Sequence, residues 1–227
     1  MTTTTPKRTT NSHPNSPAPY TGLDRLLIAG RWVTGRSDRK LQPIDPYRRT
    51  VIIEIPAADA QDIEDAYQAA RRAQVAWAEK LPSERSAVMR RASQIMEARC
   101  EEIVSWLIKE VGSTRSKAML EWNAARDLMQ QVVSAPYRAE GRILPSDIPG
   151  KERRVYRRPV GVVAVVSPWD FALHLANCSV APALALGNAV VLKPPSNTPI
   201  SGGLLLGKIY EQAGLPPGVR ARCCGFG

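Results

Sequence analysis

Uninterrupted apolar runs occupy two places in the last third of the chain. They are VGVVAVV at 160–166 and AVVL at 189–192. Continuous β-branched and small apolar residues are typical of strands that are buried on both faces of a parallel sheet. The pattern therefore predicts two such strands, about 25 residues apart, as in a β-α-β unit.

Helical signals follow each of these strands. The apolar segment from Ala181 to Leu186 predicts a helix that ends at Gly187. Thr198 and Pro199 predict the start of another helix over 202–213, with Thr198 as its N-cap. Strand, helix, strand and helix in this order predict an α/β fold in which right-handed crossovers join parallel strands.

The earlier part of the chain has a different period. Apolar residues at three- and four-residue spacing, with Asp59 and Ser83 as candidate N-caps, predict helices over 57–80, 85–99, 101–109 and 117–134. Short β-rich pieces are expected at 26–33, 51–55, 142–144 and 153–158. The last two, separated by Pro and Gly, predict a protruding hairpin rather than a core element.

Composition excludes some classes of protein. The first 20 residues are polar and lack the apolar core of a secretory signal, and no apolar run reaches the roughly 20 residues of a membrane helix. The four cysteines have neither C-x-x-C spacing nor a histidine pair, so we expect reduced thiols and no metal site. These features predict a cytoplasmic protein with no membrane partner.

The formal net charge of +10 is concentrated partly in KERRVYRR at 151–158. A nucleic-acid surface is one interpretation. No recognition motif or aromatic platform accompanies the basic residues, so the sequence favours an exposed strand or a subunit contact, and no nucleic-acid partner.

Candidate chemistry gathers in the loops that follow the two apolar strands. Ligands of open α/β sheets bind at the carboxyl ends of the strands, and the loops there are 167–171 and 193–199. Lys193 can bind ribose hydroxyls or phosphate, Ser196 adds a neutral hydroxyl, and Trp169 is either a plug or a platform. His174 is interpreted as structural because neither a carboxylate nor a cysteine can be placed beside it.

Several motifs together resemble the aldehyde dehydrogenase superfamily. They are Pro168-Trp169-Asp170-Phe171-Ala172, Gly187-Asn188 up to Lys193-Pro194, Thr198-Pro199, Gly214 to Val219, and Lys109-Glu110-Val111-Gly112 upstream. The resemblance covers residues 22–219 and is similar in wording to members that act on aromatic aldehydes such as benzaldehyde or vanillin.

The resemblance implies a Rossmann-like coenzyme domain and oxidation of an aldehyde to a carboxylic acid with NAD or NADP. It implies the helical part of the coenzyme domain over 22–137, an oligomerisation ribbon over 138–159, and the start of the sheet over 160–227. A homo-oligomer is therefore implied as well. The preceding residues, 1–21, are rich in Thr, Ser, Pro and Asn, a composition that predicts a disordered tail.

Coenzyme contacts are carried over to particular residues. Lys193 would hold the adenosine ribose, and Ser196 takes a position where strict NAD users often have a glutamate, so NADP is not excluded. The remaining coenzyme contacts would be Val166, Ser167, Pro168, Trp169 and, near the pyrophosphate, Gly227.

Three departures from the family pattern matter. Asp170 occupies the position of the oxyanion-binding asparagine, and a carboxylate has no N–H to donate. Arg220 and Arg222 stand where the family has an apolar strand, and arginine is costly in a buried strand. The sequence stops at Gly227, before the nucleophilic cysteine and the glutamate base of the family. These departures predict a truncated fragment that is inactive alone, or alternatively a non-catalytic nucleotide-binding or oligomerisation module.

Overall fold

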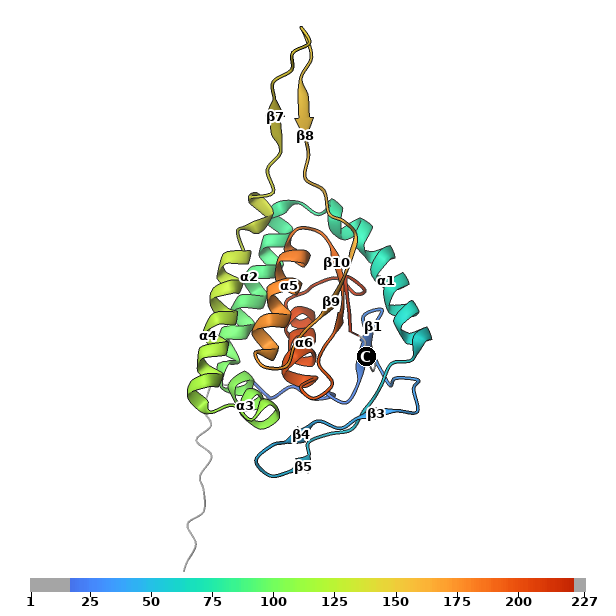
Figure 1. Cartoon of the computed structure of the whole chain (residues 1–227), viewed down its shortest axis with the longest axis vertical. Coiled ribbons are helices and arrows are strands. Elements are labelled where there is room, and N and C mark those ends of the chain that lie inside the picture. The colour runs from blue at the N-terminus through green and yellow to red at the C-terminus, as the bar shows by residue number, and fades with distance from the viewer. Residues whose placement is uncertain (1–16, 223–227) are drawn as a thin grey trace, which may run out of the picture.

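A five-stranded sheet forms the centre of the protein (Figure 1). The computed structural model describes residues 17–222. The strand order is β2-β1-β11-β10-β9, and β9 pairs with β10, and β10 with β11, in parallel. The strands are β1 (Leu26–Ile28), β2 (Arg31–Val33), β9 (Val162–Val166), β10 (Ala189–Lys193) and β11 (Arg220–Arg222). β1 pairs antiparallel with β11 and with β2. The structure thus confirms the predicted α/β fold with parallel strands, and adds two antiparallel strands at one side of the sheet.

Helices cover both faces of this sheet. α1 packs on one face, while α5 and α6 pack on the other, with α2 and α4 outside them (Figure 1). The helices are α1 (Ala60–Glu79), α2 (Pro82–Ala98), α3 (Cys100–Val111), α4 (Arg115–Val132), α5 (Ala172–Ala185) and α6 (Leu205–Gln212), with the short turns η1 (Ala135–Tyr137) and η2 (Ile200–Leu204). No helix in residues 17–222 is both long and apolar enough to cross a bilayer.

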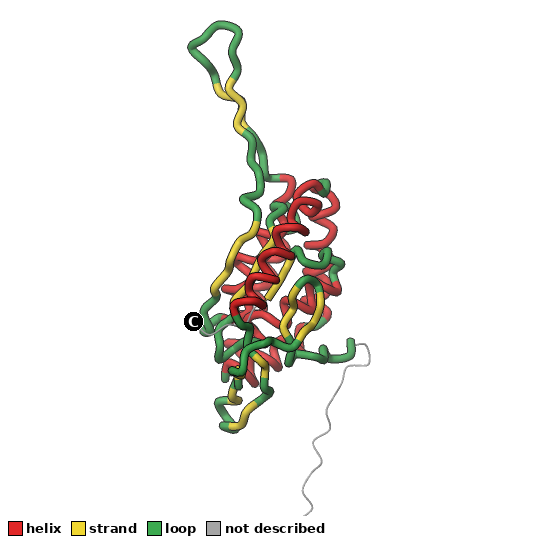
Figure 2. The backbone as a smooth tube through the Cα atoms, turned by 90° about the vertical axis from the view of Figure 1, so that its right-hand side faces the viewer, coloured by secondary structure: helices red, strands yellow, loops and turns green. Residues whose placement is uncertain are grey.

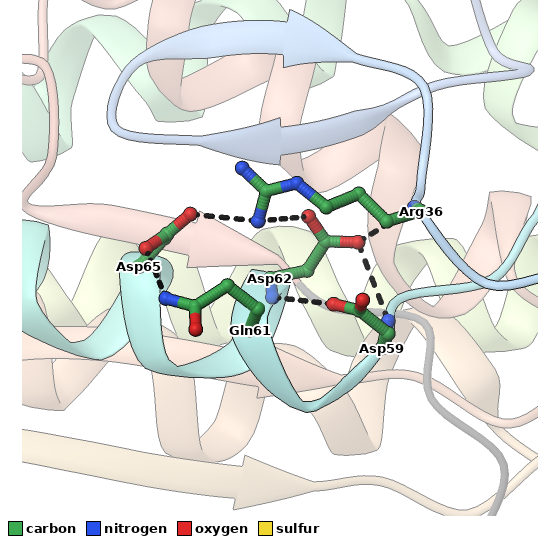
Figure 3. Close-up of polar contacts among 5 residues, drawn as sticks. All are labelled: Arg36, Asp59, Gln61, Asp62 and Asp65. Carbon is green, nitrogen blue, oxygen red and sulfur yellow. Dashed lines mark hydrogen bonds and ion pairs between the residues drawn. The ribbon is translucent and has the colours of Figure 1, made fainter.

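Asp59 is the N-cap of α1, as the sequence predicts. Its carboxylate accepts from the Asp62 backbone N–H at 2.7 Å. In turn, the Asp62 carboxylate accepts from the Asp59 backbone N–H at 3.3 Å. Figure 3 shows that Arg36 joins this cap: its guanidinium lies 3.1 Å from Asp62 and 2.8 Å from Asp65. The capping box therefore also fastens the loop after β2 to the first turn of α1.

Two local predictions in the first third are wrong. Ser83 does not cap α2, which begins one residue earlier at Pro82 because proline suits the first helical turn. The strand expected at 51–55 is divided between β5 (Thr50–Val51), which pairs with β4 (Ile44–Asp45), and β6 (Ile55–Pro56), which pairs with β3 (Lys40–Leu41). Apolar content there reflects two small hairpin-like pairs rather than one strand.

The expectation that the VGVVAVV strand is buried on both faces is also wrong. β9 is the edge strand of the sheet, and in it only Val165 is fully buried, whereas Val166 is 75% exposed. β10 lies inside the sheet, between β11 and β9, and is mostly buried. The same apolar pattern therefore encodes a central strand in one case and an edge strand in the other.

A two-stranded ribbon projects from the body of the molecule (Figures 1 and 2). It is formed by β7 (Arg142–Leu144) and β8 (Arg153–Val155), paired antiparallel. Its apolar side chains are open to solvent, with Ile143 71% and Tyr156 69% exposed. The predicted protruding hairpin is thus present, without a covered face in the single chain.

Arg220 is buried in β11, 3% exposed. Its guanidinium donates to the Gly203 carbonyl at 3.1 Å and lies 5.6 Å from the centre of the Tyr210 ring. Hydrogen bonding and contact with an aromatic face offset part of the desolvation of a buried cation. The cost expected from arginine in this strand is therefore partly compensated at Arg220.

Candidate functional site

The carboxyl ends of β9 and β10 lie side by side. In the parallel register, Val166 of β9 is opposite Lys193 of β10, and the Ser167 backbone N–H donates to the Lys193 carbonyl at 3.3 Å. The loops that leave the two strands therefore start from one edge of the sheet, as the sequence predicts. This is the edge at which open α/β sheets bind ligands.

The side chains at this edge form an open, polar surface. Lys193 is half-buried, Ser196 and Pro168 are exposed, and Trp169 is 55% exposed. Two hydroxyls behind them are buried: those of Ser167 and Thr198 have no hydrogen-bond partner among the described residues. Buried hydroxyls in folded proteins are normally bonded, so these two are unsatisfied groups beneath the edge rather than part of its open surface.

Thr198 is not the helix cap that its position suggests. The helix begins with η2, and its first N–H groups donate to a carboxylate from another helix: Ile200 N–H to Glu110 at 2.8 Å and Ser201 N–H to Glu110 at 2.6 Å. Glu110 lies near the end of α3 and is 2% exposed. A buried carboxylate accepts two bonds where a threonine hydroxyl accepts one, so the tertiary contact replaces the local cap.

The start of α5 is organised in the same way. Glu121 of α4 is fully buried and accepts from the backbone N–H groups of Leu173, at 2.8 Å, and His174, at 3.4 Å. Burial raises the pKa of Glu121, and these two N–H donors partly oppose the rise. Two buried glutamates from the helical layer thus hold the N-termini of the two helices that follow the loops.

Asp170 is neither a cap nor a member of a hydrogen-bonded catalytic group. Its side chain is exposed, and within the described residues its carboxylate is hydrogen-bonded to no base, while Glu121 accepts from the first N–H groups of α5. Its backbone carbonyl accepts from Lys117 Nζ at 2.7 Å, and the same ammonium lies 4.8 Å from the Phe171 ring centre. The turn is therefore fixed through its backbone, which leaves the carboxylate at the open edge.

His174 does have a cysteine beside it, contrary to the sequence-based interpretation. Cys178 lies one turn further along α5, and its Sγ is 3.4 Å from His174 Nε2. Burial raises the pKa of the Cys178 thiol and lowers the pKa of His174. Both shifts favour the neutral forms, so the pair lacks the thiolate–imidazolium character of an activated nucleophile. Cys100 is similar, since burial and the neighbouring Glu101 raise its pKa.

Asn188 has a role that the sequence motif alone does not disclose. Its side-chain oxygen accepts from the N–H groups of Val160 and Gly161, at 2.8 and 3.2 Å, and its amide donates to Ala183 at 3.1 Å. It therefore ties the entry to β9 to the end of α5. The signal for such residues, and for Glu110 and Glu121, is a polar side chain within an apolar stripe.

Several residues singled out in the sequence lie outside the described part of the chain. Gly227, Cys223 and Cys224 lie outside the described residues, as does most of the expected tail over 1–21. Residues 17–222 contain no cluster of three His, Cys, Asp or Glu side chains with metal-site geometry.

Comparison with known proteins matches residues 32–227 to the aldehyde dehydrogenase family. The chain is 51% identical over 212 residues to a vanillin dehydrogenase of Corynebacterium glutamicum, covering 92% of this chain and 44% of that protein. It is 41% identical over 200 residues to a benzaldehyde dehydrogenase of Bacillus subtilis, covering 88% and 41%. The chain therefore spans less than half the length of these relatives.

Solved structures similar to this chain have the same fold. An NAD-dependent benzaldehyde dehydrogenase from Corynebacterium glutamicum superposes with a TM-score of 0.87 at 51% identity, covering 90% of this chain and 45% of that one. An NADP-dependent enzyme of Escherichia coli superposes with a TM-score of 0.86 at 28% identity, covering 89% and 42%.

Proposed function

The chain belongs to the aldehyde dehydrogenase family, and from this premise we propose that it provides the NAD(P)-binding part of an enzyme that oxidises an aldehyde to a carboxylic acid. The observation that carries the proposal is the juxtaposition of Lys193 with Val166 and Ser167 at one sheet edge. The similarity to a vanillin dehydrogenase and a benzaldehyde dehydrogenase supports an aromatic aldehyde as the substrate.

The residues present suit a dinucleotide. The Lys193 ammonium can donate to ribose hydroxyls, and the exposed hydroxyl of Ser196 can donate or accept. Trp169, Pro168 and Val166 offer an exposed apolar wall beside them. When bound, the coenzyme accepts hydride from the substrate; the residues described here bind and orient it.

Ser196 bears on the choice of coenzyme. Its side chain is neutral and exposed at this edge, so it does not repel a 2′-phosphate as a carboxylate would. We therefore propose that the edge accepts NADP as well as NAD.

The nucleophile is a separate matter. Burial raises the thiol pKa of both cysteines in the described residues, Cys100 and Cys178, whereas a catalytic cysteine needs a lowered one. Asp170, in the position of the oxyanion-binding asparagine, brings an acceptor where a donor is required. We accordingly expect the 227-residue chain to bind coenzyme but not to turn over aldehyde by itself.

A second candidate function is a non-catalytic interaction module. It is favoured by the ribbon, whose Ile143 and Tyr156 are open to solvent, as expected of a surface that another subunit covers.

Calorimetric titration with NAD+ and NADP+ tests the main proposal. We expect binding by the chain, and at least about tenfold weaker binding by Lys193→Gln, since loss of one charge-assisted hydrogen bond is worth roughly 1.5–3 kcal/mol. Lys151→Gln, a charge-matched change in the ribbon, should not alter the affinity. Absence of coenzyme binding would refute the proposal and leave the interaction module.

A further inference from the structure

A large groove lies at the base of the β7–β8 ribbon. Its volume is about 1120 Å³. Five arginines line it against a single acidic residue, Glu140: Arg85, Arg138, Arg142, Arg157 and Arg158. Its apolar wall includes Pro136, Pro159, Val160 and Leu186, and none of the described lining residues is aromatic.

Arg85 is built into the wall of this groove. It is 9% exposed, and its guanidinium donates to the carbonyls of Ala185 at 3.0 Å, Ala78 at 3.1 Å and Lys80. These carbonyls belong to the last turns of α5 and α1 and to Lys80, the residue after α1. Its positive charge is thereby held in a fixed place, bonded to neutral groups rather than to a carboxylate.

The guanidinium groups around Arg85 are exposed and largely unengaged. Arg138 donates one bond, to Gln131 at 3.3 Å. The guanidinium groups of Arg142, Arg157 and Arg158 have no hydrogen-bond or ion-pair partner among the described residues. By contrast, Arg154, further out on the same ribbon, is paired with Glu152 at 2.8 Å. Three guanidinium groups without a partner among the described residues therefore meet in the groove.

The groove is distinct from the proposed coenzyme edge, which is the carboxyl end of β9 and β10 around Ser167 and Lys193. Val160 and Asn188, which line it, come just before β9 and β10, whereas Ser167 follows β9 and Lys193 ends β10. Each strand has five residues, and at about 3.3 Å per residue the two places are about 15 Å apart. A ligand in the groove leaves the coenzyme edge open.

We propose that this groove binds a polyphosphate group, meaning a ligand with two or more linked phosphates, at a site separate from the coenzyme edge. Several like charges in a concave surface attract a multivalent anion. Guanidinium forks match phosphate oxygens bidentately. The feature of the groove that recognises a ligand is its positive charge, which suits the phosphates.

The test uses the 227-residue chain and tripolyphosphate as the probe, in calorimetric titrations at constant ionic strength. The double variant Arg157→Gln/Arg158→Gln should bind tripolyphosphate at least about tenfold more weakly, since two charge-assisted contacts are lost. The matched control is Lys151→Gln/Arg153→Gln, which removes two positive charges from the same ribbon outside the groove. It should change the affinity by less than about twofold; an equal loss in both would overturn the proposal.

Three further results decide the matter. Citrate at the same concentration should bind more weakly than tripolyphosphate, and equal binding would contradict a phosphate site. Loss of tripolyphosphate binding in Lys193→Gln would assign the ligand to the coenzyme edge and overturn the proposal. If circular dichroism shows that the double variant is unfolded, Arg142→Gln alone serves in its place, and unchanged binding by that variant would count against the groove.

Discussion

Glu110 Oε2 lies 2.6 Å from the backbone nitrogen of Ser201, across 91 positions of sequence. The contact joins the end of α3 to the start of the helix that follows the Lys193 loop. It holds that helix, and hence the loop, in a fixed position relative to the helical layer. The position of the edge that we propose to bind coenzyme therefore depends on a buried carboxylate that lies outside that edge.

Removing this carboxylate should destabilise the fold. Glu110→Ala leaves two buried N–H groups without an acceptor, so we expect a loss of about 2–4 kcal/mol in the free energy of unfolding. Glu110→Gln keeps one acceptor oxygen and should lose less. Urea denaturation measures both, and Glu79→Ala, an exposed glutamate at the end of α1, is the control. Equal stability of Glu110→Ala and the control would contradict the capping role.

Glu121 should make stability depend on pH. Its pKa is raised in the folded state by burial, so between the ordinary value of 4.5 and the raised one the folded protein binds more protons than the unfolded chain. Stability from this group is full below pH 4.5 and falls as pH rises through the folded pKa. Glutamine does not titrate, so Glu121→Gln lacks this pH-dependent loss. The difference in unfolding free energy between the variant and the unsubstituted chain should therefore shift in favour of the variant as the pH rises above 4.5. Urea titrations at several pH values check this, and a parallel pH dependence of the two proteins would refute it.

Ser196 should control discrimination between the two coenzymes. Ser196→Glu places a carboxylate at the coenzyme edge, and we expect it to weaken NADP+ at least about tenfold relative to NAD+, because like charges in contact cost up to several kcal/mol. Ser196→Gln has nearly the same shape without the charge and should leave the ratio near that of serine. Dissociation constants from calorimetry give the ratio; a similar shift in both variants would mean that size rather than charge matters.

Cys178 should react slowly with alkylating agents. Because burial raises its pKa above 9.0, little thiolate exists at pH 7, and the rate with iodoacetamide should keep rising past pH 9. Peptide mass spectrometry follows this cysteine separately from the others. A rate that levels off below pH 8 would show that the Cys178 thiol is activated, and would contradict the conclusion that it is not a nucleophile.

The open edge of β9 should promote self-association. In the described residues no strand pairs with its outer side, and Ala164 and Val166 are exposed. Uncharged apolar edges pair readily with other chains, and a lysine blocks such pairing. Ala164→Lys should therefore lower the apparent mass in light scattering at high concentration, whereas Ile63→Lys, on the exposed side of α1, should not. A monomeric unsubstituted chain would exclude the edge as a contact.

Local chemistry of the sequence determined much of this protein. Alternation, periodicity and caps such as Asp59 placed the helices and the ribbon, because these signals act within one or two turns of the chain. The motifs from Pro168 to Val219 identified the family, and the strand-loop order placed Lys193 and Ser167 at one edge. Those are properties that neighbours in sequence decide.

Only the tertiary structure decided which distant acceptor bonds to each buried N–H group. Thr198 lost the cap to Glu110, because a carboxylate 90 positions earlier in the chain reaches the first N–H groups of that helix. The His174–Cys178 contact is of the opposite kind: the two residues are four positions apart on α5, a spacing at which helical side chains are neighbours. VGVVAVV reads as a central strand, yet β9 lies at the edge, since an apolar pattern records the tendency to be buried and not the number of strands available to bury it. Likewise, arginines separated by up to 73 positions, from Arg85 to Arg158, converge in one groove only after folding. Long-range partners arise from packing, and packing is a property of the whole chain.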